Sequence, residues 1–321
     1  MRAVVTGGAG FIGSHLVDRL LADGYEVVAV DNLSTGTLDN LVHIKNHSHF
    51  RFVKADLRDR QAVMELLQGV DVVFHLAAHA DIRHSALDHY VDLEQNVVPM
   101  VHILDGMLKR GVPHLVFAST SALYGEASVR PTPEEYSPIQ TSLYGASKLA
   151  CEAFAQAFTQ LGDISVWSYR FSNVVGERAR RGVIWDFVNK LKANPRRLEI
   201  LGDGKQSKEY IYVSDCVDGI ITGYLKSRGR VNTFNIAVDE TRTVDQVADI
   251  VISELGLEDS GVERVYTGGP RGWVGDNPLV MLDTSKLKAL GWTPKLGADE
   301  AIRRTARWTI KHLNTHSDAN T

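Results

Sequence analysis

The chain has 321 residues, of which 44% are hydrophobic and 23% are charged, and this suits one large α/β unit or two closely joined domains. Its 39 acidic and 35 basic residues leave a formal net charge of -4, which disfavours nucleic acid as the main partner because phosphate-backbone binders carry a basic field. The two cysteines, Cys151 and Cys216, exclude a disulfide scaffold, lack metal-ligand spacing and fit a reducing cytoplasm, so we expect no metal site.

The first predicted strand, at residues 3–6, is too close to the N-terminus to leave room for a signal peptide. Apolar residues at helical spacing then predict a helix over residues 12–21, and residues 26–31 form a second strand. Further strands are predicted at residues 51–53, 70–74, 114–118 and 165–169, with helices around residues 60–67, 91–108 and 142–161. No apolar run reaches transmembrane length, so we expect a cytoplasmic protein without membrane contact.

This alternation of helices with valine-rich strands predicts a Rossmann-type α/β fold, a doubly wound parallel sheet covered by helices on both faces. Ligands of such sheets bind at the carboxyl ends of the strands. Beyond residue 173 the rhythm loosens into a loop at 178–182, a helix at 183–193, a turn at 202–204, a strand at 210–213 and a helix at 215–225. We expect residues 1–172 to form the cofactor-binding domain and residues 173–321 to form mainly a smaller, interleaved substrate lobe.

Three glycines, Gly7, Gly10 and Gly13, follow the first strand at the spacing G-x-x-G-x-x-G and open the first helix. Small residues let the strand turn sharply and let backbone N–H groups reach a pyrophosphate, and the positive end of the helix adds to the attraction. Asp31 ends the second strand, where a carboxylate accepts hydrogen bonds from the adenosine ribose and repels a 2′-phosphate. No arginine follows directly, so the predicted cofactor is NAD rather than NADP.

Asp56 follows the third strand and has two interpretations. It can accept a hydrogen bond from the adenine amino group, with Leu57 packed on the ring. It can also be the N-cap of the helix that follows.

Tyr144 and Lys148 lie four residues apart on a predicted helix, so their side chains share one face. They follow the fifth strand and the hydroxyl residues Ser119, Thr120 and Ser121. A free phenol has a pKa of about 10 and is a poor base at neutral pH, but a nearby ammonium and a positive nicotinamide ring both favour the phenolate. Tyr144 is therefore predicted to accept the proton of a substrate hydroxyl as hydride leaves the same carbon, with Lys148 also binding the nicotinamide ribose.

Taken in order, these motifs resemble the extended short-chain dehydrogenase/reductase family, and within it the nucleotide-sugar epimerases typified by UDP-galactose 4-epimerase. The resemblance covers nearly the whole chain. Its markers are the segments at residues 6–13, 31–36, 75–78, 119–125, 144–148, 170–176 and 202–213. The NAD site that it implies is formed by Gly7, Gly10, Phe11, Ile12, Gly13, Asp31, Asn32, Ser34, Thr35, Gly36, Asp56, Leu57, Leu76, Ala77, Ala78, Asn96, Tyr144 and Lys148.

The resemblance also selects a catalytic hydroxyl. In the family it lies three residues before the apolar residue of a V-Y-G triplet, which here occupies residues 123–125 and selects Thr120, with Ser121 as a neighbour that can share the role. Related sugar 4,6-dehydratases carry Asp-Glu directly after this hydroxyl, because elimination needs an acid and a base. This chain has Ser121-Ala122 there, so water elimination is not expected.

The implied reaction is a redox-neutral inversion at C4 of a nucleotide sugar. Tyr144 removes the 4-hydroxyl proton, NAD takes the C4 hydride, and the 4-keto sugar turns about its diphosphate before the hydride returns to the other face. The implied substrate site comprises Thr120, Asn173, Val183, Lys208, Tyr210, Arg271, Asp276 and Val280.

Several of these positions depart from the family pattern. Lys208 stands where relatives usually have arginine, which keeps the charge but loses bidentate phosphate geometry. Arg271 and Asp276, expected on phosphate and nucleotide ribose, are further apart than usual, and Arg271 can instead be a surface loop charge. Val280 stands where a tyrosine in some relatives blocks N-acetyl sugars, so we expect N-acetylhexosamines to fit as well as hexoses.

A basic group of residues has two interpretations. Arg83 and the loop residues Arg178, Arg180 and Arg181 can meet the carboxylate of a uronic acid, or they can form an ordinary solvated loop.

Three functions stay open. A UDP-sugar 4-epimerase leads, followed by another nucleotide-sugar oxidoreductase of the same fold, such as a reductase, a decarboxylase or a 3,5-epimerase. A binding protein that senses the cofactor without catalysis is disfavoured because Tyr144 and Lys148 are both present. We also expect a homodimer that packs through the Tyr144 helix as in the family, since that helix carries Ala150, Ala153, Ala155 and Ala157.

Overall fold

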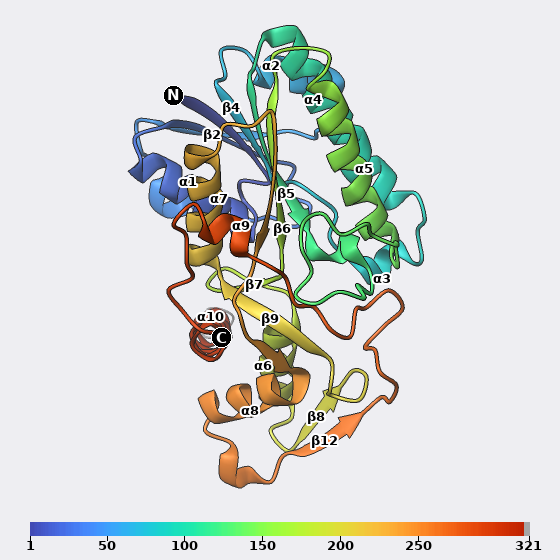
Figure 1. The fold of residues 1–321 in the computed structure, drawn as a ribbon. Helices are drawn as coiled ribbons and strands as arrows, with labels where there is room; N and C mark the ends of the chain where they lie inside the picture. The colour runs from blue at the N-terminus through green and yellow to red at the C-terminus, as the bar shows by residue number, and fades with distance from the viewer. Residues whose placement is uncertain (318–321) are drawn as a thin grey trace.

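A seven-stranded parallel sheet is the centre of the computed structural model, which describes residues 1–317 (Figure 1). Its strand order is β10-β6-β5-β4-β1-β2-β3, and each neighbouring pair is parallel. The strands are β1 (Arg2–Thr6), β2 (Glu26–Asp31), β3 (Phe50–Lys54), β4 (Val72–His75), β5 (His114–Thr120), β6 (Ser165–Phe171) and β10 (Val231–Ile236). The order reverses between β1 and β4, which confirms the predicted doubly wound α/β fold and locates the ligand crevice at their carboxyl ends.

Helices cover both faces of this sheet. Helices α1 (Phe11–Ala22) and α7 (Val213–Lys226) pack on one face, and α2 (Arg60–Leu66), α4 (Val98–Arg110) and α5 (Leu143–Phe158) pack on the other (Figure 1). Alternate residues of β1 point into different cores, with Val5 packed in the cluster of Leu16 and Val4 in that of Met100. Burial on both sides explains why the strands are continuous apolar runs.

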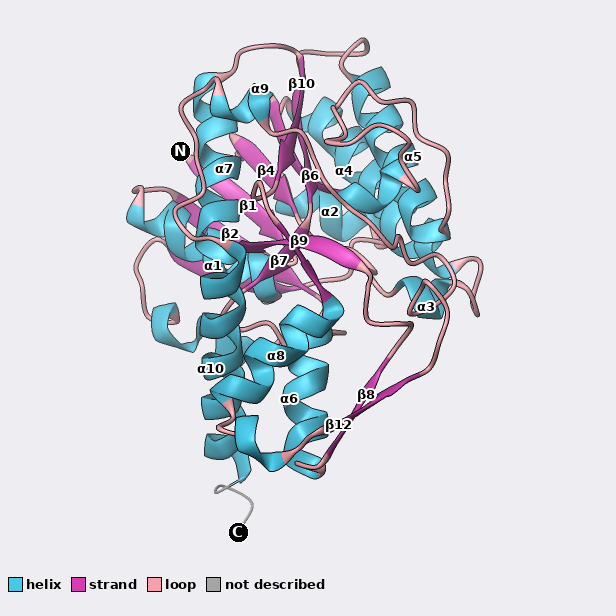
Figure 2. Ribbon diagram, turned by 60° about the horizontal axis from the view of Figure 1, so that its bottom comes forward, coloured by secondary structure: helices cyan, strands magenta, loops and turns pink. Residues whose placement is uncertain are grey.

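The smaller lobe is built on a second sheet in the order β11-β9-β7, formed by β7 (Asn173–Val175), β9 (Ser207–Tyr212) and β11 (Thr241–Thr243). Helices α6 (Val183–Ala193), α8 (Val244–Glu254) and α10 (Ala298–Ser317) pack together beside it (Figure 2). A two-stranded sheet of β8 (Arg197–Ile200) and β12 (Glu263–Tyr266) completes the lobe. Between these elements the chain returns to the main sheet through α7 and β10.

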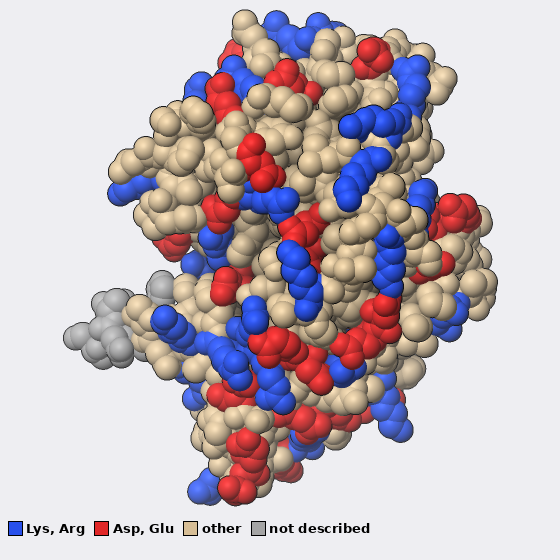
Figure 3. Space-filling model, turned by 60° about the vertical axis from the view of Figure 1, so that its left-hand side comes forward, with Lys and Arg blue, Asp and Glu red and all other residues tan. Residues whose placement is uncertain are grey.

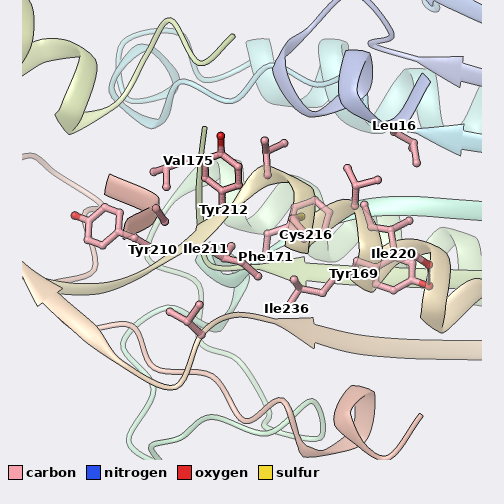
Figure 4. Close-up of a cluster of buried hydrophobic side chains, with 14 of the residues drawn as sticks. Leu16, Tyr169, Phe171, Val175, Tyr210, Ile211, Tyr212, Cys216, Ile220 and Ile236 are labelled. Carbon is pink, nitrogen blue, oxygen red and sulfur yellow. Dashed lines mark hydrogen bonds between the residues drawn. The ribbon is translucent and has the colours of Figure 1, made fainter. Parts of the chain in front are cut away.

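One hydrophobic cluster joins the lobe to the main domain. Figure 4 shows part of it, where side chains of β9, such as Tyr210 and Tyr212, lie with Phe171 of β6 and Val175 of β7. Because the two parts share this core, the lobe is held firmly over the carboxyl edge of the sheet.

Short elements refine the expected pattern. The predicted helix at residues 91–108 is a π-helical turn, η2 (Leu93–Val97), followed by α4, because Pro99 lacks the N–H that would continue the first hydrogen bonds. Other short elements are η1 (Leu38–Ile44), α3 (Ile82–Ser85), η3 (Ser121–Tyr124), η4 (Glu258–Ser260) and α9 (Ser285–Lys288).

Residues 1–317 show no sign of a membrane-spanning helix or a metal-binding cluster. Among residues 1–317, no helix has both the length and the apolar character to cross a lipid bilayer. The same range contains no group of histidine, cysteine and acidic side chains that could hold a metal ion, and Cys151 and Cys216 are buried and free. Basic and acidic side chains are interspersed over the face in Figure 3.

Candidate active site

The glycine-rich turn between β1 and α1 has no room for side chains. A Cβ on Gly7 would lie 2.7 Å from the backbone nitrogen of Ala77, and one on Gly13 would lie 2.1 Å from the carbonyl oxygen of Gly7. Gly7 also has a φ of +67°, in the left-handed region that favours glycine. The N-cap Gly10 offers no side-chain acceptor, and the first turn of α1 contains no acidic residue, so its N–H groups and positive helix end suit a pyrophosphate.

Asp31 holds the wall of this turn. Its carboxylate accepts hydrogen bonds from the backbone N–H of Ala9 at 3.1 Å and of Leu33 at 2.8 Å, and Asn32 accepts one from Ser34 N at 3.0 Å. A Cβ on Gly36 would come within 2.8 Å of Asp31 Oδ2, so the segment of Ser34, Thr35 and Gly36 packs closely over the carboxylate. A carboxylate has about four lone-pair directions, which leaves acceptor capacity for ribose hydroxyls.

Asp56 does not cap a helix, so that interpretation is wrong. Asp59 caps α2 instead, accepting hydrogen bonds from the N–H groups of Gln61 and Ala62. Asp56 forms an ion pair with Arg58, whose Nη2 lies 2.7 Å from Oδ2, and this pairing lowers the pKa of Asp56 to about 2. Its side chain therefore stays ionised as an acceptor beside Leu57 and Asn32.

The end of β4 supplies the opposite wall. The backbone N–H of Leu76 donates to Thr6 O at 3.1 Å and that of Ala77 to Thr6 Oγ1 at 3.2 Å, so residues 76–78 run alongside the glycine turn. The side chain of Asn96 in η2 links the end of this segment to α5 through hydrogen bonds. It accepts from His79 N at 2.8 Å and donates to Ser147 Oγ of α5 at 3.0 Å.

Tyr144 lies at the start of α5, facing the end of β5. Ser142 caps the helix by accepting from Gly145 N at 3.0 Å, and a hydrogen-bonding interaction with the Thr120 side chain acts to lower the pKa of the Tyr144 phenol. Thr120 Oγ1 accepts from Ala122 N at 3.1 Å. Thr120 is therefore the hydroxyl residue whose side chain acts on the phenol, while Ser121 is the half-buried first residue of η3.

The protonation of Tyr144 differs from the expected direction. Burial raises the pKa of the phenol to about 12, although the hydrogen bond with Thr120 acts to lower it. Lys148 was expected to favour the phenolate, but the folded chain alone favours the protonated phenol, because burial outweighs the hydrogen bond.

Lys148 points inward from α5 and is only 2% exposed. Its ammonium donates to Ala118 O at 2.8 Å and lies 4.6 Å from the centre of the Phe117 ring. Burial lowers its pKa to about 8, and the neighbouring Cys151, Glu152 and Asp92 act in the opposite direction. Lys148 is thus poised between its two protonation states near neutral pH.

Some side chains around this pair were missed by the sequence analysis. Asp92 and Glu152 are both almost fully buried, and Asp92 Oδ1 accepts from His79 Nδ1 at 2.9 Å. Glu152 follows Lys148 by four residues on the same helix, and this spacing is a sequence signal that could have identified it. Asp92 has no comparable sequence signal because its approach depends on how η2 packs.

The smaller lobe places several of the predicted substrate residues on β9, on its neighbour β7 or in contact with them. Asn173 begins β7 and is paired in register with Tyr210 of β9. Lys208 forms an ion pair with the buried carboxylate of Asp276, and its ammonium lies 5.4 Å from the Trp273 ring centre. This places Lys208 and Asp276 together, with Trp273 as an unforeseen neighbour.

The remaining predicted substrate residues differ in exposure. Tyr210 is buried in the main cluster at 3% exposure, whereas Val183 at the start of α6 and Val280 are half-buried. Arg271 forms an exposed ion pair with Glu126, whereas Asp276 pairs with Lys208. The roles of Arg271 and Asp276 on phosphate and nucleotide ribose stay predictions.

The basic loop after β7 is tied by ion pairs to α1 and η1 of the main domain. Arg178 Nη2 donates to Asp18 of α1 at 2.8 Å, and Arg180 Nη2 lies 3.4 Å from Asp39 of η1. Arg83 lies apart from these two, with its guanidinium carbon 5.7 Å from the Trp273 ring centre. Arg178 and Arg180 thus already have carboxylate partners within the chain.

Comparison with known proteins agrees with this geometry. The model of the NAD dependent epimerase/dehydratase family matches residues 3–237. A putative UDP-glucose 4-epimerase of Methanocaldococcus jannaschii is 34% identical, covering 97% of this chain and 99% of that protein. The crystal structure of a UDP-galactose 4-epimerase has a TM-score of 0.86 at 38% identity, covering 98% of this chain and 100% of that one. A UDP-glucose 4-epimerase of Thermotoga maritima with UDP-glucose has a TM-score of 0.88 at 32% identity, with the same coverage.

The similarity also extends to enzymes with other products. UDP-glucuronic acid decarboxylase 1 of Arabidopsis thaliana is 31% identical over 95% of this chain and 68% of that protein. The dTDP-D-glucose 4,6-dehydratase of Mus musculus is 30% identical over 99% of this chain and 91% of that protein. The comparisons therefore confirm the nucleotide-sugar class and the NAD cofactor, and they leave the particular reaction to the chemistry of the site.

Proposed function

Because the chain belongs to the NAD-dependent epimerase/dehydratase family, we propose that it is a 4-epimerase of UDP-sugars with NAD as a bound cofactor. The observation that carries this proposal is the arrangement of Thr120, Tyr144 and Lys148 at the carboxyl end of β5. The threonine side chain interacts with the phenol closely enough to act on its pKa, and the ammonium is buried one helical turn away. Such a pair can hold the oxygen of one sugar carbon and move its proton.

The residues of the chain divide the chemistry as follows. NAD, when bound, supplies the hydride chemistry that takes C4 of the sugar through a transient ketone. Thr120 orients the sugar hydroxyl and Tyr144 accepts its proton and later returns it, so no net proton is consumed. Lys148 holds a positive charge beside the phenol, which favours the base form. The glycine turn and Asp31 hold the dinucleotide in place.

The residues after Thr120 support epimerisation over elimination. Loss of water from a sugar needs a second acid–base pair close to the phenol. At this position the chain has Ser121 and Ala122, neither of which titrates near neutral pH. A keto sugar formed here therefore has no group next to Thr120 to expel its neighbouring hydroxyl.

The substrate lobe supports a UDP-sugar with a neutral ring. Asn173 and Lys208 lie on the neighbouring strands β7 and β9, and an amide and an ammonium there suit a diphosphate. Arg178 and Arg180 are already paired with acidic residues, which removes two of the four arginines considered for a uronate carboxylate. Val280 is short and leaves space for a C2 substituent, so glucose, galactose and their N-acetyl forms are the substrates we expect.

The test is turnover without added reductant. Purified protein is incubated with UDP-glucose, UDP-N-acetylglucosamine, UDP-glucuronate and dTDP-glucose, and the products are resolved by NMR. The proposal expects equilibrium mixtures of C4 epimers from one of the first two sugars. Stoichiometric consumption of NADH, release of carbon dioxide or formation of a 4-keto-6-deoxy product would each replace it with another activity of the family.

We also propose a homodimer that packs through α5. The outer side of this helix and its end carry Leu143, Phe154 and Leu161, which are 42% to 64% exposed, next to the exposed Ala153 and Ala157. This apolar stripe supports an intersubunit helix contact. In contrast, Ala155 is buried in the chain's own core and Ala150 packs against that core, so these two do not face a partner. Phe154→Glu is expected to give a monomer by light scattering, and a monomeric wild type at micromolar concentration would contradict the dimer.

A further inference from the structure

A buried ion pair joins helix α5 to strand β6 directly behind the catalytic side chains. Glu152 of α5 is 1% exposed and Arg170 of β6 is 7% exposed. Arg170 donates to Glu152 through Nη2 at 2.7 Å and Nε at 3.1 Å, and Ser119 Oγ donates to the same carboxylate at 2.5 Å. Because Ser119 and Arg170 are neighbours in the register of β5 and β6, one carboxylate fastens α5 to both strands.

This fastening point lies next to each catalytic group. Ser119 directly precedes Thr120, and Glu152 is one helical turn beyond Lys148 on the same helix. Ser119 and Glu152 set the distance between β5 and α5 at this point. They therefore also set the distance between Thr120 and the helix that carries Tyr144. A change in the position of Glu152 would be transmitted to both sides of that pair.

The other side of Arg170 anchors the ion pair. Its Nη1 donates to Tyr124 Oη at 2.8 Å and to Glu134 O at 2.7 Å. The Tyr124 hydroxyl donates to Asn235 Oδ1 at 2.8 Å, which continues the chain of hydrogen bonds into β10. The guanidinium therefore has fixed partners on both sides, and the carboxylate cannot drift without breaking several buried bonds.

The groups that face Lys148 come from three parts of the main domain. Cys151 and Glu152 lie on α5, Asp92 lies next to η2, and His75 lies at the end of β4. Burial lowers the pKa of His75 to about 3 and raises that of Cys151 to about 11, so both are neutral at physiological pH. Among these groups, Glu152 and Asp92 are left as the negative charges that balance the buried ammonium.

We propose that Glu152 is a positioning residue of the reaction, whose carboxylate, held between Arg170 and Ser119, keeps Lys148 charged and keeps the Thr120 end of β5 against α5. The inference rests on the proposed function in one respect, that Lys148 is taken as a member of the catalytic pair. A merely structural ion pair would stabilise the fold and leave the titration of Lys148 unchanged.

The test compares Glu152→Gln with the wild type by following Lys148 itself. Protein labelled with 13C at the lysine Cε is titrated by NMR, and the Lys148 signal is identified by its loss in Lys148→Arg. Wild-type Lys148 is expected to titrate near its pKa of about 8. In Glu152→Gln the midpoint is expected to fall by at least about half a pH unit, because one of two balancing charges is lost. The alkaline limb of the pH profile of kcat should move to lower pH together with this midpoint.

A matched control is Glu254→Gln. Glu254 of α8 also accepts hydrogen bonds from two arginines, Arg303 and Arg307, and it lies in the smaller lobe away from Lys148. The control should leave the Lys148 midpoint at the wild-type value. An unchanged midpoint in Glu152→Gln, or an equal shift in Glu254→Gln, would overturn the inference.

A second variant covers the case in which Glu152→Gln does not fold, since it leaves a buried guanidinium unpaired. Glu152→Gln with Arg170→Met removes both partners, and Arg170 is not among the groups that shift the pKa of Lys148, so the same downward shift is expected. The titration also separates the two proposals. If no sugar is turned over by the wild type and the midpoint still moves, the proposed function fails, and only the effect of Glu152 on the charge of Lys148 stands.

Discussion

A hydrogen-bonding interaction with the side chain of Thr120, the last residue of β5, acts on the pKa of the phenol of Tyr144, the second residue of α5. This interaction is the point where the carboxyl edge of the main sheet meets the helix that carries the proposed base. It acts to lower the pKa of the phenol, whereas burial acts to raise it. The balance between these two effects determines how readily Tyr144 accepts a proton.

Tyr144→Phe removes the hydroxyl that is proposed to move the proton and keeps the ring. We expect kcat to fall by about 10²- to 10⁴-fold, the usual contribution of a general base, with NAD content and melting temperature close to wild type. Steady-state turnover of the active UDP-sugar is the measurement. Tyr90→Phe, at a tyrosine that is 69% exposed, is the control and should keep full activity. Unchanged activity in Tyr144→Phe would remove the proposed base.

Thr120→Val removes the hydroxyl partner of Tyr144 at nearly constant volume. Because the hydrogen bond lowers the pKa of the phenol, its loss should raise that pKa further above about 12 and move the rising limb of the pH–rate profile to higher pH. At neutral pH we expect kcat to fall on the order of tenfold to hundredfold, as for the loss of one hydrogen bond to a charged group. Thr120→Ser keeps a hydroxyl and should retain most activity; an equal loss in both variants would contradict this role.

Gly13→Ala is expected to destroy the cofactor turn, because its Cβ would lie 2.1 Å from Gly7 O. We expect the affinity for NAD, measured by calorimetry, to fall by more than about tenfold, or about 1.4 kcal/mol. Gly256→Ala is the matched control. It has a positive φ and open space around its Cβ position, so it should lower the melting temperature without changing NAD binding. Equal NAD binding in Gly13→Ala and wild type would show that the dinucleotide lies elsewhere.

Glu209 of β9 gives the fold a pH dependence that is separate from catalysis. The residue has no exposed surface, one carboxylate oxygen accepts from Leu282 N at 3.0 Å, and the other has no hydrogen-bond partner among the described residues. Burial raises its pKa from 4.5 to about 8. Between these values the folded chain retains a proton that the unfolded chain has released, so the free energy of unfolding should fall as pH rises through this window and level off above it.

Glu209→Gln should remove this contribution. Urea unfolding at about pH 5 and about pH 9 is expected to show a smaller loss of stability with rising pH in the variant than in the wild type, where one such group contributes at most about 1.4 kcal/mol per pH unit. Glu26→Gln, at a side chain that is 58% exposed, should behave like the wild type. Parallel stability curves for wild type and Glu209→Gln would contradict the assignment.

The parts of the fold that depend on local pattern were predictable. The strands of the main sheet are continuous apolar runs and the helices between them carry one apolar face, so β1 to β6 and their helices appear in the sequence within a few residues. The elements after residue 225, such as β10, α8 and α10, were not assigned. Their strands are short and one of them, β10, pairs with β6 across a long stretch of chain, which no local periodicity can indicate.

The residues of the site also fall into two classes, those indicated by local sequence and those whose contacts depend on the folded structure. The spacing of Gly7, Gly10 and Gly13 and the four-residue step from Tyr144 to Lys148 are local features, and each acts through neighbours on one turn or one helix. The pairing of Asp56 with Arg58 and of Arg178 with Asp18 depends on side-chain geometry. Asp56 proved to be an ion-paired acceptor and no helix cap, and Arg178 proved to have a carboxylate partner within the chain.

By itself, the order of residues determined the sheet, the dinucleotide turn and the identity of the proposed base, because backbone conformation and helical spacing follow from neighbouring residues. Only the tertiary structure decided how the site is charged. The raised pKa of Tyr144, the lowered pKa of Lys148 and the approach of Asp92 arise from burial among elements that are distant along the chain. Desolvation depends on what surrounds a group in three dimensions, and that is a property of the packed molecule.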